Sequence, residues 1–358
     1  MDKFDTSVAL LISSLVGAGV FAMPIFARQV GLLSVFVITA SFLYMLGLGY
    51  LIIEMFPGTV EEEVDRYVGP WAGSAMLLVE ISIIFLALTS YAMALKTHLG
   101  ISDLSILIIL LIPLILELHL PSNFTLFTSF FTLAFVSILS LLAIPRMELP
   151  VSIFLASGSI VTQTAKEVVA PSLINLSAVL PLFLVGLFAF YGHNMIPRIR
   201  NVVRNQKTTK KVFYMAISIV FLLYLPFVIS VSGLGVDKLA TKYLSEYFTV
   251  PLSSTIDLFS LVIFYTAFMI YGTHLATDFG GRKKSTGLII GGVAILYFLA
   301  SLLQVSSMMV IAAAGFGVTL YAFLVSLAGH NAKKLFPVPT LVLAGTVLTW
   351  LFLLFQVF

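Results

Sequence analysis

The chain has 358 residues, a formal net charge of +3 and no cysteine. Without thiols it can form neither a disulfide nor a thiolate metal site, and its small, scattered charge gives no nucleic-acid surface. Hydrophobic residues make up 60% of the chain and charged residues 10%, whereas soluble domains carry about 25% charged residues. Apolar runs of about 20 residues, each able to cross a ~30 Å hydrocarbon core, recur from end to end. The composition therefore predicts an all-α polytopic membrane protein.

Eleven transmembrane helices are predicted from these runs. The first run follows MDKFD and has the charge pattern of a signal peptide. Because the rest of the chain is equally apolar, we interpret it as an uncleaved first span. The predicted spans cover residues 7–29, 32–55, 72–95, 104–120, 124–145, 177–204, 212–234, 254–279, 286–304, 306–328 and 336–357.

Lysine and arginine in the loops orient the chain, since cytoplasmic loops carry an excess of both. With the N-terminus in the cytoplasm, 13 of the 19 cationic side chains lie inside and 6 lie outside, and the loop Arg198–Lys211 holds six of the inner ones. This predicts a cell-membrane protein whose C-terminus lies outside.

One apolar stretch, within 147–176, does not fit a span. Its apolar part, VSIFLASGSIVTQ, has only about 13 residues, which is short for a crossing, and a crossing there would change the balance to 5 inside and 14 outside. We expect an outer loop, partly helical or re-entrant. Residues 235–252 are expected to form a second outer segment with a short surface helix.

The first span contains a sequence that favours an interrupted helix, SSLVGAGVFAMP at Ser13–Pro24. Gly17 and Gly19 tolerate non-helical backbone, and Pro24 cannot donate to the helix ladder. Opened backbone inside a bilayer is tolerated only where protein or a wet cavity surrounds it. The alternative is that these glycines only allow close helix packing.

A second break is predicted in span six, within LFAFYGHNMIP at residues 187–197. Asn and His are costly in a span unless they face a cavity or a partner. Breaks in spans one and six place five spans between equivalent points, so the second half would be inverted, and such paired breaks mark transporter sites. We expect one domain over 1–358, built from repeats at about 7–145 and 177–328 and an extra helix at 336–357.

Several stretches resemble a known family. GAGVFAMP is similar to the first helix of the aromatic amino acid permeases, the tryptophan/tyrosine permease family of the amino acid–polyamine–organocation superfamily. LGLGYLIIE, ending at Glu54, resembles their second helix, and EISIIFLALTSYAMA, at residues 80–94, resembles their third with Tyr91 on its tyrosine.

The resemblance continues in order along the chain. In FYGHNMIP, His193 stands four residues before Pro197, as in the family's FHGxVP pattern, and residues 259–279 resemble the eighth helix with Thr266 on its threonine. The resemblance implies a LeuT-type five-plus-five inverted repeat with discontinuous helices 1 and 6, and amino acid uptake coupled to an ion gradient, usually protons. Ala267 replaces a frequent serine, and span five has no lysine.

The broken helices suit an amino acid zwitterion without any charged side chain. The helix N-terminus would bind the carboxylate, and carbonyls at the helix C-termini, at Ser14 and Phe190, would bind the ammonium. The candidate carboxylate-binding amides are those of Gly17, Ala18, Gly19 and Val20. We expect no cofactor and no bound metal, and the partners expected are an amino acid and the lipid bilayer.

Four side chains near the breaks have two interpretations each. Tyr91 either closes the site or faces a helix or lipid, and the aromatic Tyr191, like Phe190, either lines the pocket or only packs. His193 either fixes the unwound backbone or carries a proton, and we favour the structural role.

Glu80 is the single carboxylate well inside a predicted span. It precedes Tyr91 by 11 residues, so both fall on one helical face, with Glu80 about 16 Å toward the cytoplasm. Intramembrane carboxylates are functional candidates. We hypothesise that Glu80 takes part in proton coupling, the alternative being a pair with Arg66 or with an arginine of the loop after span six.

Sodium coupling is the alternative to proton coupling. The Thr266 hydroxyl and the carbonyls of Ser13 and Val16 could supply oxygen ligands, but Ala267 lacks a second hydroxyl, so we favour protons. The chain carries no HExxH and no Ser–His arrangement with an orienting group, which disfavours a membrane enzyme. A channel is disfavoured because the two breaks differ from each other.

Overall fold

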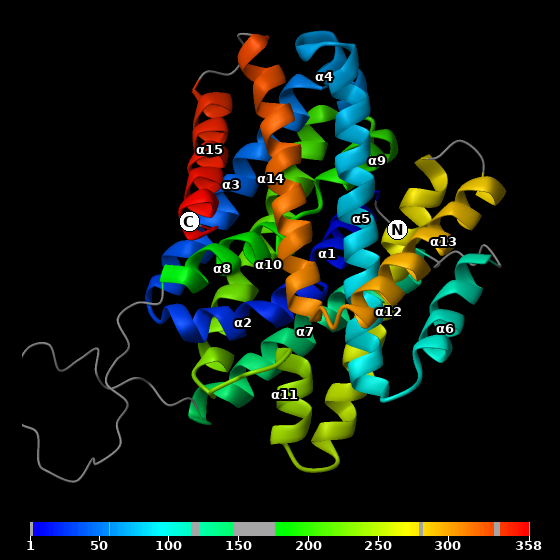
Figure 1. The fold of residues 1–358 in the computed structure, drawn as a ribbon, viewed down its shortest axis with the longest axis vertical. Coiled ribbons are helices and arrows are strands. Elements are labelled where there is room, and N and C mark those ends of the chain that lie inside the picture. Colours follow the sequence, from blue (N-terminus) through cyan, green and yellow to red (C-terminus); the bar gives the residue numbers. More distant parts are fainter. Residues whose placement is uncertain are drawn as a thin grey trace, which may run out of the picture.

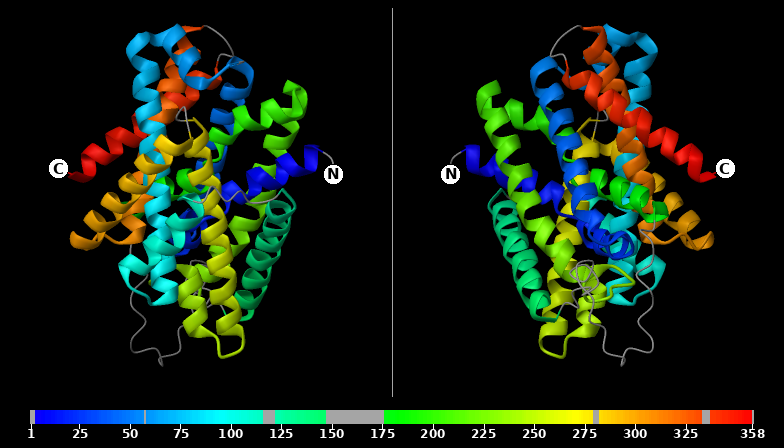
Figure 2. Two further views of the ribbon diagram at one scale, coloured as in Figure 1. Left: turned by 90° about the vertical axis from the view of Figure 1, so that its right-hand side faces the viewer. Right: turned by 90° about the vertical axis from the view of Figure 1, so that its left-hand side faces the viewer.

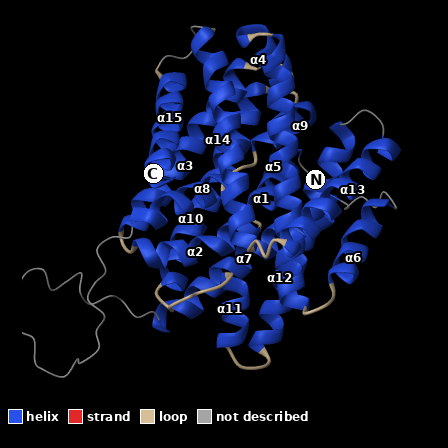
Figure 3. Cartoon of the chain, viewed as in Figure 1, coloured by secondary structure: helices blue, strands red, loops and turns tan. Residues whose placement is uncertain are grey.

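The computed structural model describes residues 3–56, 58–115, 122–146, 176–278, 282–332 and 337–357. Every regular element within these ranges is a helix, and Figure 3 shows them joined by short loops. The prediction of an all-α protein is confirmed for this part of the chain. The loop expected at 147–176 lies, up to residue 175, outside the described residues.

The helices follow one another through the described ranges (Figure 1). Their bounds are α1 Lys3–Leu15, α2 Ala18–Val30, α3 Leu33–Met55, α4 Val60–Val68, α5 Pro70–Leu99, α6 Asp103–Ile115, α7 Ser122–Ala143, η1 Ile144–Arg146, α8 Leu176–Ala189, η4 His193–Met195, α9 Ile196–Val203, α10 Gln206–Ser232, α11 Ala240–Tyr247, α12 Leu252–Asp278, α13 Arg282–Leu302, α14 Ser307–Asn331 and α15 Val338–Val357. The short helix expected within 235–252 is present as α11.

Membrane-crossing segments can be recognised by length and hydropathy. Among the described residues, seven helices are long and apolar enough to cross a membrane, and the bent pair α1–α2 would make eight. The apolar parts Gly291–Leu302 of α13 and Val338–Leu351 of α15 are shorter. The chain is thus a multi-pass membrane protein, while eleven spans and the inverted repeat stay predictions.

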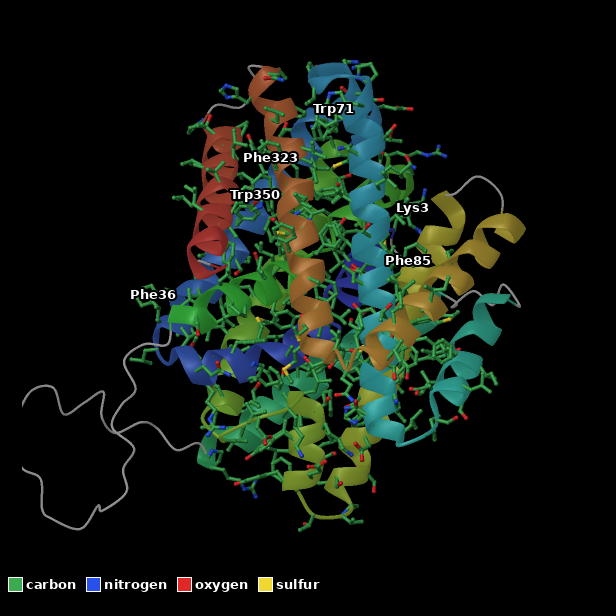
Figure 4. The ribbon with its side chains drawn as sticks, viewed as in Figure 1. Lys3, Phe36, Trp71, Phe85, Phe323 and Trp350 are labelled. Carbon is green, nitrogen blue, oxygen red and sulfur yellow. The ribbon has the colours of Figure 1, made fainter. Side chains whose placement is uncertain are left out.

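Two long helices, α5 and α14, run side by side through the molecule, and α12 packs against α5 (Figure 1). The interrupted segments are inside: α1 packs on α7 and α10, and α2 packs on α8 and α10. Figure 2 shows α15 projecting at the periphery. It is anchored on α14, where the Trp350 and Phe323 rings lie 5.0 Å apart (Figure 4).

A tight corner joins α4 to α5 at one end of the bundle, opposite the end that carries α11 (Figure 1). Thr59 caps α4 by accepting from the Glu62 amide. Gly69 adopts φ +134, which favours glycine, and Pro70 begins α5. The Gly73 amide then donates to Asp65 at 2.5 Å. These contacts fold α4 back along the first turns of α5.

Candidate functional site

The first break separates α1 from α2. The two helices meet at 48°, and Val16 and Gly17 lie between them. Gly17 is extended and serves as the N-cap of α2 with no side-chain cap hydrogen bond. The first N–H groups of α2 therefore lack an intrahelical partner and carry partial positive charge. The predicted interruption is confirmed, but Pro24 lies inside α2 instead of at the break.

The second break follows α8. This helix ends at Ala189, and a single 3₁₀ turn, η4, precedes α9, whose first turn contains Pro197. The non-helical residues are Phe190, Tyr191 and Gly192. The predicted interruption of span six is therefore also present.

The two breaks lie against each other, and glycine permits the approach. A Cβ atom added to Gly19 would lie 2.9 Å from the Ala189 Cα atom at the end of α8. A Cβ atom on Gly192 would lie 2.8 Å from the Leu11 side chain of α1. Real Cβ atoms do not approach backbone atoms so closely, so the first contact in particular requires glycine.

Two tyrosine hydroxyls from outside the broken segments satisfy carbonyls at the breaks. The Tyr271 hydroxyl of α12 lies 2.8 Å from the Tyr191 carbonyl and 3.1 Å from the Ser14 carbonyl, so its single proton is shared between both breaks. The Tyr224 hydroxyl of α10 donates to the Leu15 carbonyl at 2.8 Å. Both tyrosines are fully buried.

Tyr91 of α5 is placed at the first break. A Cβ atom on Gly17 would lie 2.5 Å from the Tyr91 hydroxyl oxygen, so the ring packs directly on the glycine. The Tyr91 ring also lies 6.1 Å from the Tyr271 ring. The neighbouring Ala18 and Val20 are completely buried. The site residues predicted on α2 and α5 are thus together, and their role in binding stays a prediction.

The aromatic residues of the second break point in different directions. Phe190 packs among aromatic rings of α3 and α10, with centroids 5.8 Å from Phe42 and 5.4 Å from Tyr224. Tyr191 packs edge-on against Tyr321 of α14 at 5.7 Å. Phe190 therefore contributes to packing next to the break.

His193 ties the second break to α3. Its Nε2 atom donates to the Met45 carbonyl at 2.8 Å, and the imidazole is fully buried. This hydrogen bond fixes which nitrogen carries the proton in the neutral ring. The hydrogen bond holds the second break against α3, and a role of His193 in transport stays a prediction.

Several buried polar atoms near the breaks have no hydrogen-bond partner within the described ranges. They are the Tyr191 hydroxyl, the His193 Nδ1 atom, both side-chain amide atoms of Asn194 and the Thr266 hydroxyl. Buried polar groups are nearly always hydrogen-bonded in folded proteins. Four of these five atoms belong to residues 191–194 at the second break, and the Thr266 hydroxyl lies on α12.

The oxygens proposed for sodium are the carbonyls of Ser13 and Val16, on α1 and directly after it, and the Thr266 hydroxyl. The Ser13 hydroxyl, which is not among them, is hydrogen-bonded to Ser129 of α7. Val16 donates its amide to Ile12 at 3.0 Å and leaves its carbonyl beyond the end of α1. Thr266 lies on α12, which packs against α1.

A pair of carboxyl groups lies between α4 and α5. Glu61 is hydrogen-bonded to Glu80, and burial together with the Glu80 charge raises the pKa of Glu61 to about 7. The alternative partner of Glu80, Arg66, is paired with Glu63 at 2.9 Å. The two carboxyl groups act electrostatically on Tyr191 and Tyr321, which connects them with the second break.

Four residues at or near the breaks were not among the site residues predicted from the sequence: Glu61, Asn194, Tyr224 and Tyr271. Glu61 stands in the run EEE and has the appearance of a solvated surface charge. The two tyrosines are ordinary apolar-helix residues until the chain folds. Only Asn194, an amide in a predicted span, carried a signal that could have identified it.

Residues 2–232 match the family described as "Transmembrane amino acid transporter protein". No curated protein matches the sequence. Crystal structures of the Eremococcus coleocola manganese transporter are similar in fold: a mutant gives a TM-score of 0.59 at 12% identity over 99% of this chain and 85% of that chain. The structure of the same transporter in complex with an aromatic bis-isothiourea substituted compound gives a TM-score of 0.58 at 13% sequence identity. That match covers 98% of this chain and 84% of the transporter chain.

Gly17→Ala is expected to force the Tyr91 ring away from the first break, because the new Cβ atom would meet the ring at 2.5 to 2.9 Å. Overpacking of this kind costs about 1–3 kcal/mol, which a thermal unfolding midpoint would register. The matched control is Gly291→Ala, where nothing lies within 4 Å. Equal midpoints for the two variants would contradict the packing described here.

Tyr271→Phe is expected to leave the Ser14 and Tyr191 carbonyls without their shared donor, at a cost of about 1–3 kcal/mol, and to lower solute affinity. Tyr44→Phe is the control, since the Tyr44 hydroxyl bonds Thr346 at 2.5 Å, away from both breaks. The measurement is the stability of each variant with and without amino acid. A Tyr271 variant that keeps the ligand-induced shift in full would show that this hydroxyl does not organise the site.

Proposed function

We propose that this chain, which belongs to the transmembrane amino acid transporter family, is a secondary active carrier that takes up an amino acid by proton symport. The observation that carries the proposal is the pair of interrupted helices lying against each other in the protein interior. Such breaks form the substrate sites of secondary transporters with inverted repeats. The proposed architecture is the LeuT-type five-plus-five repeat, with the N-terminus in the cytoplasm and the C-terminus outside.

The uncapped N-terminus of α2 is the proposed seat of the substrate carboxylate. Its N-cap, Gly17, offers no side chain to compete for the free amides. The ammonium would lie at carbonyls of the α1 and α8 ends. The Ser14 carbonyl already accepts from Tyr271, but a carbonyl oxygen has two lone pairs and can accept again. Asn194 adds a buried amide that can both donate and accept.

The substrate proposed is an aromatic or another neutral amino acid. Neither break contains an acidic or a basic side chain apart from His193, which is held on α3. A site for a lone metal ion would be expected to contain carboxylates, and the described residues hold no cluster of three or more His, Asp or Glu arranged for a metal. The zwitterion is therefore favoured over a cation.

Proton coupling is assigned to the Glu61–Glu80 pair. Two carboxyl groups in contact cannot both be ionised without repulsion, so the pair retains one proton up to a higher pH than a single carboxyl group. The charge of the pair contributes to the electrostatic environment of Tyr191 and Tyr321. The alternative is sodium coupling, favoured by the unpartnered Thr266 hydroxyl.

Transport is tested with the purified protein in liposomes. Uptake of a labelled amino acid is expected in sodium-free buffer under an inward proton gradient, and unlabelled amino acid inside should accelerate it by exchange. A thermal-shift screen of the twenty amino acids selects the label. Uptake that requires sodium would show that sodium is the coupling ion in place of protons. A flux that unlabelled amino acid inside the liposomes does not accelerate would indicate a channel.

Removal of the carboxyl pair is expected to change the pH dependence. A raised pKa means that Glu61 is protonated below about pH 7 and ionised above it, so wild-type stability should fall as the pH rises from 5 to 8. Glu61→Gln and Glu80→Gln should flatten both this profile and that of uptake.

Glu62→Gln, which alters the exposed neighbour on α4, is the control and should retain both profiles. An unchanged pH dependence of uptake in the Glu80 variant would exclude the pair from coupling.

A further inference from the structure

A cavity of about 650 Å³ lies at the end of α3, against α9 and the turn into α10. It is separate from the two breaks. Its lining is dominated by polar side chains: Glu54, Arg200, Asn201, Arg204, Asn205 and Gln206. None of these residues takes part in the proposed carrier function, so the cavity requires its own explanation.

The wall of the cavity is rigidly built. The Arg200 guanidinium donates to the Phe56 carbonyl and, at 3.1 Å, to the Ile53 carbonyl, which are groups left free where α3 ends. The Gln206 side chain donates to the same Ile53 carbonyl at 3.0 Å. These contacts join α9, the second half of the interrupted span, to α3 and keep the cavity at their junction.

The charge in and around the cavity is positive. Residues Arg198–Lys211 contain six cations and no acidic residue. The acidic residue in the lining, Glu54, is paired with Lys210. Four of the cations are exposed and have no ion pair or hydrogen bond in the part of the chain that the structure describes: Arg198, Arg204, Lys207 and Lys211.

Arg204 brings this free charge to the cavity wall. It ends α9 in the left-handed region, with φ +52 and ψ +24, where glycine is the usual residue and a side chain is strained. Its guanidinium presents a planar set of donors suited to paired oxygen atoms of a phosphate. The neighbouring amides of Asn201 and Asn205 can add further polar contacts.

The surroundings favour a lipid over a free anion. Val202 on α9, two residues before Arg204, is 38% exposed, and Met215 and Leu222 on α10 are 48% and 68% exposed. Both helices that border the cavity thus present apolar side chains to their surroundings, as membrane-embedded helices do. A lipid whose headgroup lay in the cavity would meet apolar side chains on both helices.

We propose that this cavity is a binding site for the phosphate headgroup of an anionic phospholipid of the inner leaflet. Basic pockets at the cytoplasmic ends of membrane helices suit such headgroups. The choice of leaflet rests on the orientation in the proposed function. A headgroup held by Arg204 next to the end of α3 would fasten α9 in place, so the lipid would stabilise the arrangement of the second break.

The test measures lipid binding to the full-length protein in detergent, without amino acid. Phosphatidylglycerol, phosphatidylcholine and inorganic phosphate are titrated separately, and binding is followed by native mass spectrometry and thermal shift. Phosphatidylglycerol should bind and raise the unfolding midpoint, with an affinity about fivefold weaker in Arg204→Gln. Arg204→Lys, which retains the positive charge, should lose less affinity for phosphatidylglycerol than Arg204→Gln.

The control is Arg66→Gln, which removes an exposed arginine paired with Glu63 at the same end of the bundle. It should bind phosphatidylglycerol like the wild type. Equal affinity for phosphatidylglycerol and phosphatidylcholine, or an unaffected Arg204→Gln variant, would overturn the proposal. If inorganic phosphate binds as tightly as phosphatidylglycerol does, the cavity is a site for small anions and not for a lipid. The lipid titration contains no amino acid and does not measure transport. Its result therefore does not depend on whether the protein transports an amino acid.

Discussion

The shared proton of the Tyr271 hydroxyl is the interaction on which the central structure depends. Opened backbone inside a membrane protein needs partners from the protein itself. Here the carbonyl ends receive them: Ser14 and Tyr191 share Tyr271, and Leu15 receives the Tyr224 proton. The amide end at α2 has only Gly17 as its cap. The opened backbone is thus satisfied at its carbonyl ends, while the amide end at α2 has no side-chain cap.

An arginine side chain joins neighbouring segments at each end of the bundle, through different hydrogen bonds. At the α11 end, Arg28 near the end of α2 donates to the Gly235 carbonyl at 2.5 Å. At the α4 end, Arg200 of α9 is fastened to the last carbonyls of α3. Each contact holds the second half of an interrupted span against a neighbouring segment. Movement of either half-helix away from its neighbour would break hydrogen bonds made by an arginine.

The likeness to the manganese transporter of Eremococcus coleocola concerns the fold, at 12% identity. The family match concerns the sequence and covers residues 2–232. A likeness of fold does not carry the solute over, since one fold hosts many functions. In this chain the polar side chains at the breaks include Tyr191, Tyr271 and Asn194.

The sequence by itself determined that the chain is helical, that it crosses a membrane many times and that it opens near Gly17 and Gly192, because hydropathy, glycine and proline act locally along the chain. Tyr91 was singled out only through the resemblance of residues 80–94 to the third permease helix, and the tertiary structure placed it beside the first break. Only the tertiary structure decided what satisfies the opened backbone: Tyr271 and Tyr224 act from distant helices, and no local pattern marks them. The same holds for Glu61, which became the partner of Glu80 when the corner at Gly69 folded α4 onto α5, and for Arg66, which turned to Glu63 instead. Contacts between segments remote in sequence depend on packing, and packing is not encoded in any single stretch.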